Sequence, residues 1–350
     1  MAGSKRLQTR GVCEEKVLTS LAEKFEEASR KVDALIDKIV SADREPKLLY
    51  EASRHLIEAG GKRLRPFLTL KSCEVVGGHV GNALPVAAAV ELLHTFTLIH
   101  DDIMDRDRQR RGRQTVHVKW GVPIAITAGD LLFAKVYESI LHYTDLEQVP
   151  PNRLLKALDI ITNAAIAICE GQANDMMFEE KETISEEEYF KMIGGKTASL
   201  LKAAAQTGAI VGGGTNLQVK HVGDFAFYSG LAFQIVDDIL GLTADEKALG
   251  KTVGSDIREG KRTLIISNAL STADREQRNL ILSALGNRKA PTDQIRRVTG
   301  IIVELGSIDY AFKKAKTLGE EAKQQLSIFP DSPAKTSLLE FNDYLIVRRR

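Results

Sequence analysis

The sequence contains little cysteine and almost no charge imbalance. Its three cysteines, Cys13, Cys73 and Cys169, are spread over 350 residues and form no C-x-x-C pair. This spacing argues against a disulfide framework and indicates reduced thiols in a cytoplasmic protein. The 48 basic and 47 acidic residues leave a net charge of only +1, whereas a general nucleic-acid-binding protein usually carries a basic excess. We therefore expect no nucleic-acid partner.

Long uncharged hydrophobic runs and an apolar N-terminal segment are also lacking. Residues 1–10 are polar and basic, which does not fit a secretory signal. The longest apolar stretches are residues 84–99 and 225–236; the first contains Glu91 and His94, and each leads into paired aspartates. These features predict buried core helices rather than membrane spans, so an integral membrane protein is not expected.

Familiar catalytic motifs are missing as well. We find no pattern of a Ser-His-Asp triad, no H-E-x-x-H zinc motif and no Rossmann glycine fingerprint. The segment Gly194-Gly195-Lys196-Thr197 looks like the end of a P-loop, but the glycine that a P-loop needs five residues before Gly195 is Phe190. A Walker-type nucleotide site is therefore excluded.

Helical periodicity is what the sequence has in abundance. Ala, Leu and Ile recur at helical spacing, glycine and proline mark the breaks, and no convincing period-two series indicates strands. We predict an all-α fold of about ten helices, packed as one large bundle around buried central helices. One domain is expected to span residues 17–350, with residues 1–16 as an irregular or helical lead. The expected helices are 17–42, 48–59, 84–105, 122–143, 152–178, 185–210, 217–242, 263–284, 292–305, 307–328 and 335–347.

A first cluster of carboxylates ends the apolar stretch at residues 84–99. In Asp101-Asp102-Ile103-Met104-Asp105, Asp101 and Asp105 stand four residues apart and share one face of a helix. Like charges at this spacing destabilise an isolated helix by about 0.2–0.5 kcal/mol, so they call for a compensating cation. N-capping does not explain them, because no helix breaker lies between Pro85 and Asp101. Two carboxylates on one face, completed by water and phosphate oxygens, suit octahedral Mg²⁺.

A second cluster repeats this layout. Asp237-Asp238-Ile239-Leu240-Gly241 follows the apolar stretch at residues 225–236. Two such clusters, each at the far end of an apolar helix, predict carboxylates that face each other across one cavity.

Cations recur beside glycines. Gly60-Gly61-Lys62-Arg63-Leu64-Arg65-Pro66 combines three cations with a turn whose N–H groups can bind an anion. Arg110-Arg111-Gly112 follows the first aspartates, and Lys251 and Lys261 flank Gly254-Ser255-Asp256. A single such cation is more often a solvated surface charge. Their repeated pairing with glycines and carboxylates instead indicates sites for diphosphate, whose negative charge grows as it leaves.

Together these motifs resemble the trans-type prenyl diphosphate synthases. In order, they are Gly-Gly-Lys-Arg-Leu-Arg-Pro at 60–66, Asp101-Asp102-x-x-Asp105-x4-Arg110-Arg111-Gly112, Gly171-Gln172-x-x-Asp175, Gly195-Lys196-Thr197, Phe233-Gln234-x-x-Asp237-Asp238, and Gly250-Lys251 with Gly260-Lys261. Each motif is weak alone, but six in this order over residues 45–265 are highly specific. The resemblance implies a helical homodimer with an active site in a central cavity of each subunit. It also implies Mg²⁺ as cofactor, with isopentenyl diphosphate and allylic diphosphates as substrates.

The resemblance further implies roles for individual residues. The diphosphate of isopentenyl diphosphate would be bound by Lys62, Arg65, His94 and Arg111, although a lone histidine on an apolar helix is usually a core residue. The allylic diphosphate would be bound by Arg110, Lys196, Thr197, Gln234, Lys251 and Lys261. The Mg²⁺ ions would be held by Asp101, Asp105 and Asp237. Many relatives have a third aspartate where this chain has Gly241, so the second cluster departs from the family pattern there.

The chemistry that this family implies needs no side-chain nucleophile. Diphosphate leaves the allylic substrate, the double bond of isopentenyl diphosphate attacks the resulting carbocation, and a proton is lost. Catalysis is then positioning and electrostatics, which agrees with the missing catalytic motifs. The expected catalytic residues are Asp101, Asp105, Lys196, Thr197, Gln234 and Asp237, where Thr197 and Gln234 would stabilise the cation by their dipoles.

Phe96 is the expected floor of the tunnel for the growing chain. It precedes Asp101 by five residues, or about 7.5 Å along a helix, while Thr97 beside it is small and Leu93 is a turn deeper. Ordinary core packing is the simpler explanation of Phe96. Residues 94–105 nevertheless resemble the archaeal geranylgeranyl diphosphate synthases, which implies a C20 product, with C15 and C25 as alternatives.

Two other functions fit the aspartate clusters less well. A terpene cyclase would not need a second diphosphate site, so Lys62, Arg65 and Arg111 speak against it. A non-catalytic regulatory subunit would be expected to lose the aspartates, and here the first cluster is intact.

Overall fold

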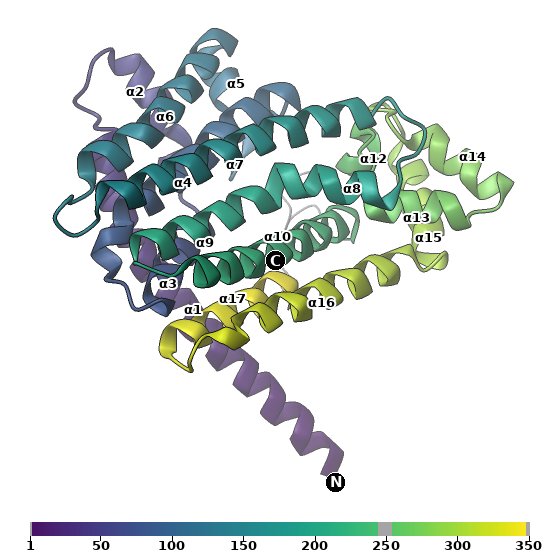
Figure 1. Cartoon of the computed structure of the whole chain (residues 1–350). Helices are drawn as coiled ribbons and strands as arrows, with labels where there is room; N and C mark the ends of the chain where they lie inside the picture. The colour runs from purple at the N-terminus through teal and green to yellow at the C-terminus, as the bar shows by residue number, and fades with distance from the viewer. Residues whose placement is uncertain (1, 244–253, 348–350) are drawn as a thin grey trace. The chain divides into compact units, whose positions relative to one another are not determined.

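The structure, a computed structural model, describes residues 2–243 and 254–347, with side chains from Leu21 onward. It is almost wholly helical (Figure 1), which confirms the predicted all-α class. The earlier elements are α1 (Ala2–Ile39), α2 (Lys47–Glu58), α3 (Leu64–Val75), α4 (Val80–Met104), β1 (Gln109–Arg110), β2 (Arg113–Gln114), α5 (Val116–Trp120), α6 (Val122–Tyr143) and α7 (Pro151–Phe178). The later ones are α8 (Glu186–Ile193), the π-helix η1 (Gly194–Ala198), α9 (Ser199–Val211), α10 (Asn216–Thr243), α12 (Ser255–Glu259), α13 (Leu264–Thr272), α14 (Arg275–Ala284), α15 (Thr292–Glu304), α16 (Ser307–Gln325), the 3₁₀-helix η2 (Leu326–Ile328) and α17 (Pro333–Val347).

Two compact units divide the chain. The first unit consists of Met1–Thr162, Ala203–Gly223 and Leu326–Tyr344. The second unit consists of Asn163–Lys202, Asp224–Gln325 and Leu345–Arg350. The first aspartate cluster therefore belongs to the first unit, and the second cluster belongs to the second.

In the first unit, α4 is the central helix. It packs against α6, α3 and α1, and its residues from Pro85 to Leu93 are all buried. A cluster of aromatic rings joins other helices of the unit: Phe25 of α1 lies edge-on to Phe67 of α3 at 4.7 Å, and Phe67 stacks on Phe341 of α17 at 5.8 Å. A fully buried α4 explains why its sequence is apolar on every side, whereas a surface helix would show one apolar stripe.

In the second unit, a core that includes Tyr189, Ile235 and Ile265 holds the helices together. The chain begins α8 with a capping box, in which Glu188 N donates to Ser185 Oγ at 3.1 Å and Ser185 N donates to Glu188 Oε2 at 2.8 Å. α13 packs against α16 and α15, and Figure 1 shows α12 to α15 gathered in one group.

Two predicted helices are interrupted in the structure. The predicted segment 263–284 is α13 and α14, because Asp274 caps α14 and accepts from Gln277 N at 2.8 Å. The predicted segment 185–210 is α8, η1 and α9, with the wider π turn over Gly194–Ala198. By contrast, α1 is one continuous helix from Ala2. Of the two alternatives predicted for the N-terminal lead, irregular or helical, residues 2–16 are therefore helical.

Among the described residues, two helices are long and apolar enough to cross a membrane by length and composition alone. They are Val80–Met104 and Asn216–Thr243, whose apolar windows are 67% and 56% buried within the protein. Core helices of soluble proteins pass the same test, so this finding agrees with the expectation of buried helices.

Candidate active site

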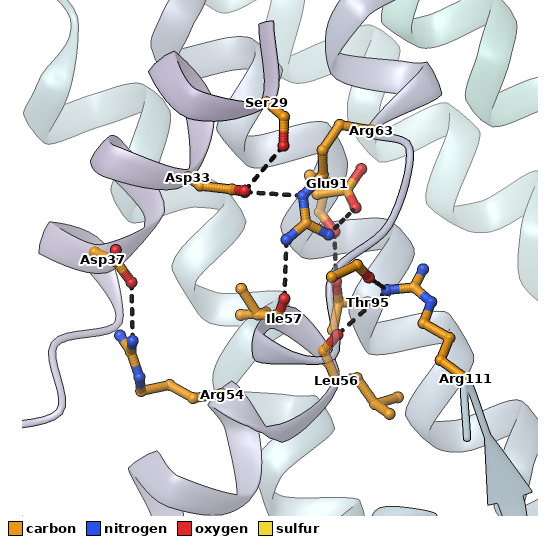
Figure 2. Close-up of polar contacts among 11 residues, drawn as sticks. Ser29, Asp33, Asp37, Arg54, Leu56, Ile57, Arg63, Glu91, Thr95 and Arg111 are labelled. Carbon is orange, nitrogen blue, oxygen red and sulfur yellow. Dashed lines mark hydrogen bonds and ion pairs between the residues drawn. The ribbon is translucent and has the colours of Figure 1, made fainter. Parts of the chain in front are cut away.

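The sequence Gly60 to Pro66 places its middle cation, Arg63, in the protein interior (Figure 2). Arg63 is 3% exposed, and its guanidinium donates to Asp33 Oδ1 at 2.8 Å, Glu91 Oε1 at 2.9 Å and the carbonyl oxygen of Ile57 at 2.9 Å. Burial alone would lower the pKa of Arg63, but the charges of Glu91 and Asp33 outweigh burial and raise it. The charged side chain of Arg63 thus links α1, α2 and α4. It holds the glycine turn at residues 60–61 in place.

Replacing Arg63 should strongly destabilise the protein. In Arg63→Ala, Glu91 would keep a buried charge without its partner, so we expect the free energy of unfolding to fall by about 3–5 kcal/mol. Arg54→Ala is the matched control, because the carboxylates that bind Arg54, on Asp37 and Glu58, are 60% and 51% exposed (Asp37 in Figure 2). That change should cost about 0.2–1 kcal/mol. Urea unfolding measures both, and equal losses would contradict the assignment.

Three of the four residues predicted for isopentenyl diphosphate, Arg65, His94 and Arg111, belong to the first unit, and the charges of both arginines act on His94. Burial comes first in lowering the pKa of His94 well below its ordinary value, and the positive charges of Arg65, Arg111, Arg110 and Arg63 lower it further. His94 is therefore neutral at neutral pH and stands in a strongly positive field. A neutral imidazole among guanidinium groups can donate a hydrogen bond to an anion that the arginines attract.

A β-hairpin that the sequence analysis missed positions Arg110 and Arg111. β1 and β2 pair antiparallel, with Gln109 opposite Gln114 and Arg110 opposite Arg113. The two residues between the strands, Arg111 and Gly112, have φ values of 53° and 73°. Two positive φ angles are typical of a type I′ turn, for which glycine at the second position is favoured.

The glycine turn at 60–61 accommodates the Arg111 side chain. The guanidinium of Arg111 donates to the carbonyl oxygen of Gly60, and to that of Leu56 at 3.2 Å (Figure 2). A Cβ atom at position 61 would lie only 3.0 Å from Arg111 Nη1. The missing side chain of Gly61 thus leaves room for an arginine that comes from another element.

Lys62, the fourth predicted residue of this set, contacts a different part of the first unit. Its ammonium lies 5.2 Å from the centre of the Tyr344 ring. It lines a cavity of about 280 Å³ together with side chains of α1, among them Phe25 and Glu26. The structure therefore places Lys62 toward α1 and α17, next to the glycine turn.

The first aspartate cluster ends α4. Asp101 and Asp105 are half-buried, and Asp105 N donates to the carbonyl oxygen of Asp101 at 2.8 Å as the helix closes. Asp102, on another face, is 1% exposed and accepts from Arg110 Nε at 2.5 Å. Burial raises the pKa of Asp102 to about 6, although Arg110 opposes this shift. Arg110, expected to bind the allylic diphosphate, is therefore oriented by Asp102.

Of the predicted chain-length residues on α4, Phe96 packs against other aromatic rings. Phe96 is half-buried, and its ring centre lies 5.2 Å from that of Phe133 on α6 and 4.7 Å from that of His100. Leu93 is fully buried, and Thr97 Oγ1 donates to the carbonyl oxygen of His94 at 2.8 Å. Phe96 and Phe133 together form a bulky apolar contact between α4 and α6. Phe96 precedes Asp101 by five residues on α4.

In the second unit, a chain of hydrogen bonds links Thr197 to the second aspartate cluster. Thr197 Oγ1 donates to Gln234 Oε1 at 2.7 Å, and Gln234 Nε2 donates to Asp238 Oδ1 at 2.9 Å. Tyr189 OH, fully buried, donates to Asp238 Oδ2 at 2.7 Å. Burial and then the charge of Asp256 raise the pKa of Asp238 to about 8. Asp238 thereby fixes the orientation of the Gln234 amide, while the neighbouring Asp237 is half-buried.

Asp175, to which the sequence analysis gave no role, binds two of the predicted lysines. Lys196 Nζ donates to Asp175 Oδ2 at 2.6 Å, and Lys261 Nζ donates to the same oxygen at 3.1 Å. Lys261 also lies 3.1 Å from Glu179 Oε1. The remaining lysine of the predicted set, Lys251, lies outside the described residues.

Close backbone contact between α7 and η1 brings Lys196 to Asp175. A Cβ atom on Gly171 would lie 2.8 Å from the carbonyl carbon of Gly195, and one on Gly195 would lie 2.6 Å from the carbonyl oxygen of Ala167. Glycine on both sides permits this approach, and Asp175 follows one helical turn after Gly171 on α7. This contact explains why Gly171 and Gly195 are glycines at the positions that precede Asp175 and Lys196.

The ionised carboxylate of Asp175 should stabilise the fold in a pH-dependent way. Burial alone would raise the pKa of Asp175, but Lys196 and then Lys261 outweigh burial and lower it. Because the folded pKa is depressed, the contribution is fully present above the unfolded value of about 3.9 and is lost as pH falls through the folded pKa. We expect wild type to exceed Asp175→Asn in stability at pH 7 and the difference to shrink below about pH 4. Urea unfolding at several pH values measures this, and a difference independent of pH would contradict it.

The described residues contain no three His, Cys, Asp or Glu side chains close enough to hold a metal ion by themselves. The donors nevertheless fit Mg²⁺, which usually takes one or two carboxylates and completes its shell with water and substrate phosphates. Asp101 and Asp105 stand one turn apart on α4. Beside them, Asp102 Oδ2 is a buried oxygen without a hydrogen-bond partner among the described residues.

The fold is all-helical, aspartates end its apolar helices, and cations stand next to glycines. These features are typical of enzymes that act on diphosphates. Comparison with known proteins shows the family directly. The chain belongs to the polyprenyl synthetase family, whose model matches residues 46–302. This confirms the resemblance that the motifs indicated and identifies the chain as a prenyltransferase.

Individual relatives match over nearly their whole lengths. A geranylgeranyl diphosphate synthase from Sulfolobus acidocaldarius is 45% identical over 93% of this chain and 98% of its own. A geranylfarnesyl diphosphate synthase from Aeropyrum pernix is 41% identical over 87% of this chain and 95% of its own. The crystal structure of a geranylgeranyl pyrophosphate synthetase from Pyrococcus horikoshii matches with a TM-score of 0.89 and 41% identity, over 95% of this chain and 99% of that one.

Proposed function

We propose that the protein is a short-chain prenyl diphosphate synthase that adds isopentenyl diphosphate to allylic diphosphates and releases geranylgeranyl diphosphate, a C20 product. The observation that carries the proposal is that each of the two units has its own group of cations. One is the group of Arg65, Arg111 and neutral His94 in the first unit, and the other is Lys196 and Lys261 in the second. A reaction between two diphosphates needs two such sites, whereas a terpene cyclase needs one.

In the proposed reaction, the two groups bind different substrates. Arg65, Arg111 and His94 bind isopentenyl diphosphate, with Lys62 beside the glycine turn, while Arg110, Lys196, Thr197, Gln234, Lys251 and Lys261 serve the allylic diphosphate. Asp101, Asp105 and Asp237 would hold Mg²⁺, which supplies positive charge to the departing diphosphate when it is bound. No side chain forms a covalent bond in this scheme, so these residues act by position and charge.

The Thr197 and Gln234 dipoles would act on the substrate after ionisation. Gln234 accepts from Thr197 and donates to Asp238, so its amide cannot turn without breaking one of two hydrogen bonds. The hydroxyl oxygen of Thr197 keeps its lone pairs for a nearby cation because its proton is committed to Gln234. Oriented dipoles stabilise developing charge most when they need no reorganisation during the reaction.

One set of parallel incubations tests the function. Purified protein, Mg²⁺ and labelled isopentenyl diphosphate are combined with C5, C10 or C15 allylic diphosphate in separate tubes, and the dephosphorylated products are separated by chromatography. A dominant C20 alcohol is expected. A C15 or C25 alcohol would keep the chemistry and overturn the product length. Cyclic hydrocarbons, or no incorporation from any primer, would overturn the proposal in favour of a cyclase or a regulatory subunit.

We also propose a homodimer, in agreement with the expectation from the motifs. One side of α6 carries large apolar side chains that remain exposed, namely Val122 at 43%, Ile126 at 44% and Leu141 at 54%. Light scattering coupled to size-exclusion chromatography should give about twice the chain mass of 38.5 kDa. Ile126→Glu should shift this mass toward the monomer, and an unchanged dimer would exclude α6 from the interface. A cytoplasmic location stays a prediction.

A further inference from the structure

The Phe96 ring has a second neighbour, which comes from its own helix. His100 stands one turn after Phe96 on α4, and the two ring centres lie 4.7 Å apart with 64° between the ring planes. Phe133 of α6 lies 5.2 Å from the same phenylalanine ring. Phe96 therefore contacts one ring from α4 and one from α6, and both contacts restrict how the Phe96 ring can turn.

The imidazole of His100 is itself fixed to α6. Its Nε2 lies 3.2 Å from the carbonyl oxygen of Ile126, and because a carbonyl oxygen only accepts, Nε2 carries a proton and donates it. Residues 126, 129 and 133 recur at intervals of three and four, so they share one face of α6. The face of α6 that anchors His100 is thus the one that carries Phe133.

Gly129 leaves the space that this imidazole occupies. A Cβ atom at position 129 would lie 2.6 Å from His100 Cδ2, 3.2 Å from His100 Cε1 and closer still to His100 Nε2. Its three nearest neighbours would all be atoms of the imidazole ring, and none would belong to the backbone of α4. By contrast, a Cβ atom at Gly208 of α9 would meet the backbone of Thr69 on α3. Gly129 therefore accommodates a side chain and not a close approach of two helix backbones.

We propose that His100, seated over Gly129, is a positioning residue that holds the Phe96 ring in place and thereby limits product length. This inference rests on the proposed function and on Phe96 as the floor of the tunnel. His100 acts through Phe96 and not on the substrate. Because protein interiors are closely packed, a growing chain that meets Phe96 displaces the ring only where a neighbouring ring gives way, and the hydrogen bond to Ile126 keeps His100 from doing so.

The ratio of products longer than C20 to the C20 product tests this role. His100→Ala removes one of the two ring contacts of Phe96 and should raise the ratio by roughly two- to tenfold, the factor that corresponds to the loss of one aromatic pair. His100→Phe keeps a ring beside Phe96 and should restore the ratio toward that of wild type. His142→Ala, at an exposed histidine near the end of α6, is the matched control and should not change the ratio.

A double-mutant cycle distinguishes this role from a general loosening of α6. Gly129→Ala places a methyl group where the imidazole lies, so the ring must leave and the ratio should rise as it does in His100→Ala. In the His100→Ala background the same methyl group meets no imidazole, so Gly129→Ala should not raise the ratio further. Because alanine forms helices better than glycine, the double variant should also melt at a higher temperature than His100→Ala alone.

The outcomes separate this inference from the proposals on which it rests. An unchanged ratio in His100→Ala, together with longer products in Phe96→Ala, would overturn the role of His100 and leave the function and the floor standing. Additive effects of His100→Ala and Gly129→Ala would also overturn it. If His100→Ala, next to Asp101, is inactive, Gly129→Ala decides, and an unchanged ratio there would refute the inference.

Two further results would remove its foundations. Unchanged products in Phe96→Ala would exclude Phe96 as the floor and the positioning role of His100 with it, while C20 synthesis by wild type would still support the function. Wild-type protein that incorporates no isopentenyl diphosphate would contradict the proposed function itself.

Discussion

Asp101→Asn and Asp105→Asn should each lower kcat/KM by at least about a thousandfold, the largest effect expected for any single change in this protein. The two carboxylates end α4 one turn apart, and each substitution removes one of the two charges that the proposed Mg²⁺ needs on that face. Without the Mg²⁺ ion, only cationic side chains would neutralise the charge that develops on the departing diphosphate. Steady-state incorporation of labelled isopentenyl diphosphate, at the Mg²⁺ concentration that just saturates wild type, measures the loss.

Two controls distinguish the loss of a metal ligand from a general effect of removing a negative charge. Asp331→Asn changes a fully exposed aspartate of the same unit and should leave activity unchanged. Raising the Mg²⁺ concentration should recover part of the activity of Asp105→Asn if that carboxylate is a ligand. Activity within tenfold of wild type in both variants would refute the assignment of the first cluster.

Phe96→Ala should lengthen the product beyond C20. The ring of Phe96 lies 5.2 Å from that of Phe133, and the two side chains form a bulky apolar contact about 7.5 Å along the helix from Asp101. Removing the Phe96 ring leaves an apolar cavity that a longer prenyl chain can fill, and burial of apolar surface favours that outcome by about 0.8 kcal/mol for each added CH₂. Chromatography of the dephosphorylated products should show C25 and longer alcohols as the main species.

The partner ring offers a second test of the same floor. Phe133→Ala removes the other half of the contact and should lengthen the product to a smaller extent. Phe312→Ala, a half-buried ring on α16 in the other unit, should leave the C20 product unchanged. An unchanged product profile in both Phe96→Ala and Phe133→Ala would contradict the hypothesis that these rings close the end of the tunnel for the growing chain.

Much of the fold could be predicted from sequence because the long helices carry local signals. The apolar stretches that end in aspartates are α4 and α10, whose composition marks them as core helices. The break between α13 and α14 was missed, although Asp274 and Gln277 form a capping box that is readable in sequence. The π turn at Gly194–Ala198 was missed because glycine pairs do not reveal which helical pitch they adopt.

The missed parts of the site depend on contacts between residues that are distant in sequence. Two-residue strands such as β1 and β2 have no periodicity to detect, so the hairpin that carries Arg110 and Arg111 was not predicted. The family resemblance gave roles to Lys62 and Arg65 and none to Arg63, and the contacts of Arg63 with Asp33 and Glu91 show that Arg63 is structural. In the same way, Gly241 signals a departure in sequence, and only the structure shows that a Cβ atom at this position would lie 2.5 Å from Asp256 Oδ2 of α12.

The shared carboxylate of Asp175 has a consequence for turnover. Lys196 and Lys261 both contact one oxygen of Asp175, so these two cations have a counter-ion before any substrate arrives. In the proposed reaction, diphosphate competes with a resident anion when it binds, and that anion takes its place again when the product diphosphate departs. Release of the by-product is thereby spared the full cost of separating opposite charges. In that scheme the carboxylate of Asp175 would weaken substrate binding and would also ease the release of diphosphate before the next cycle.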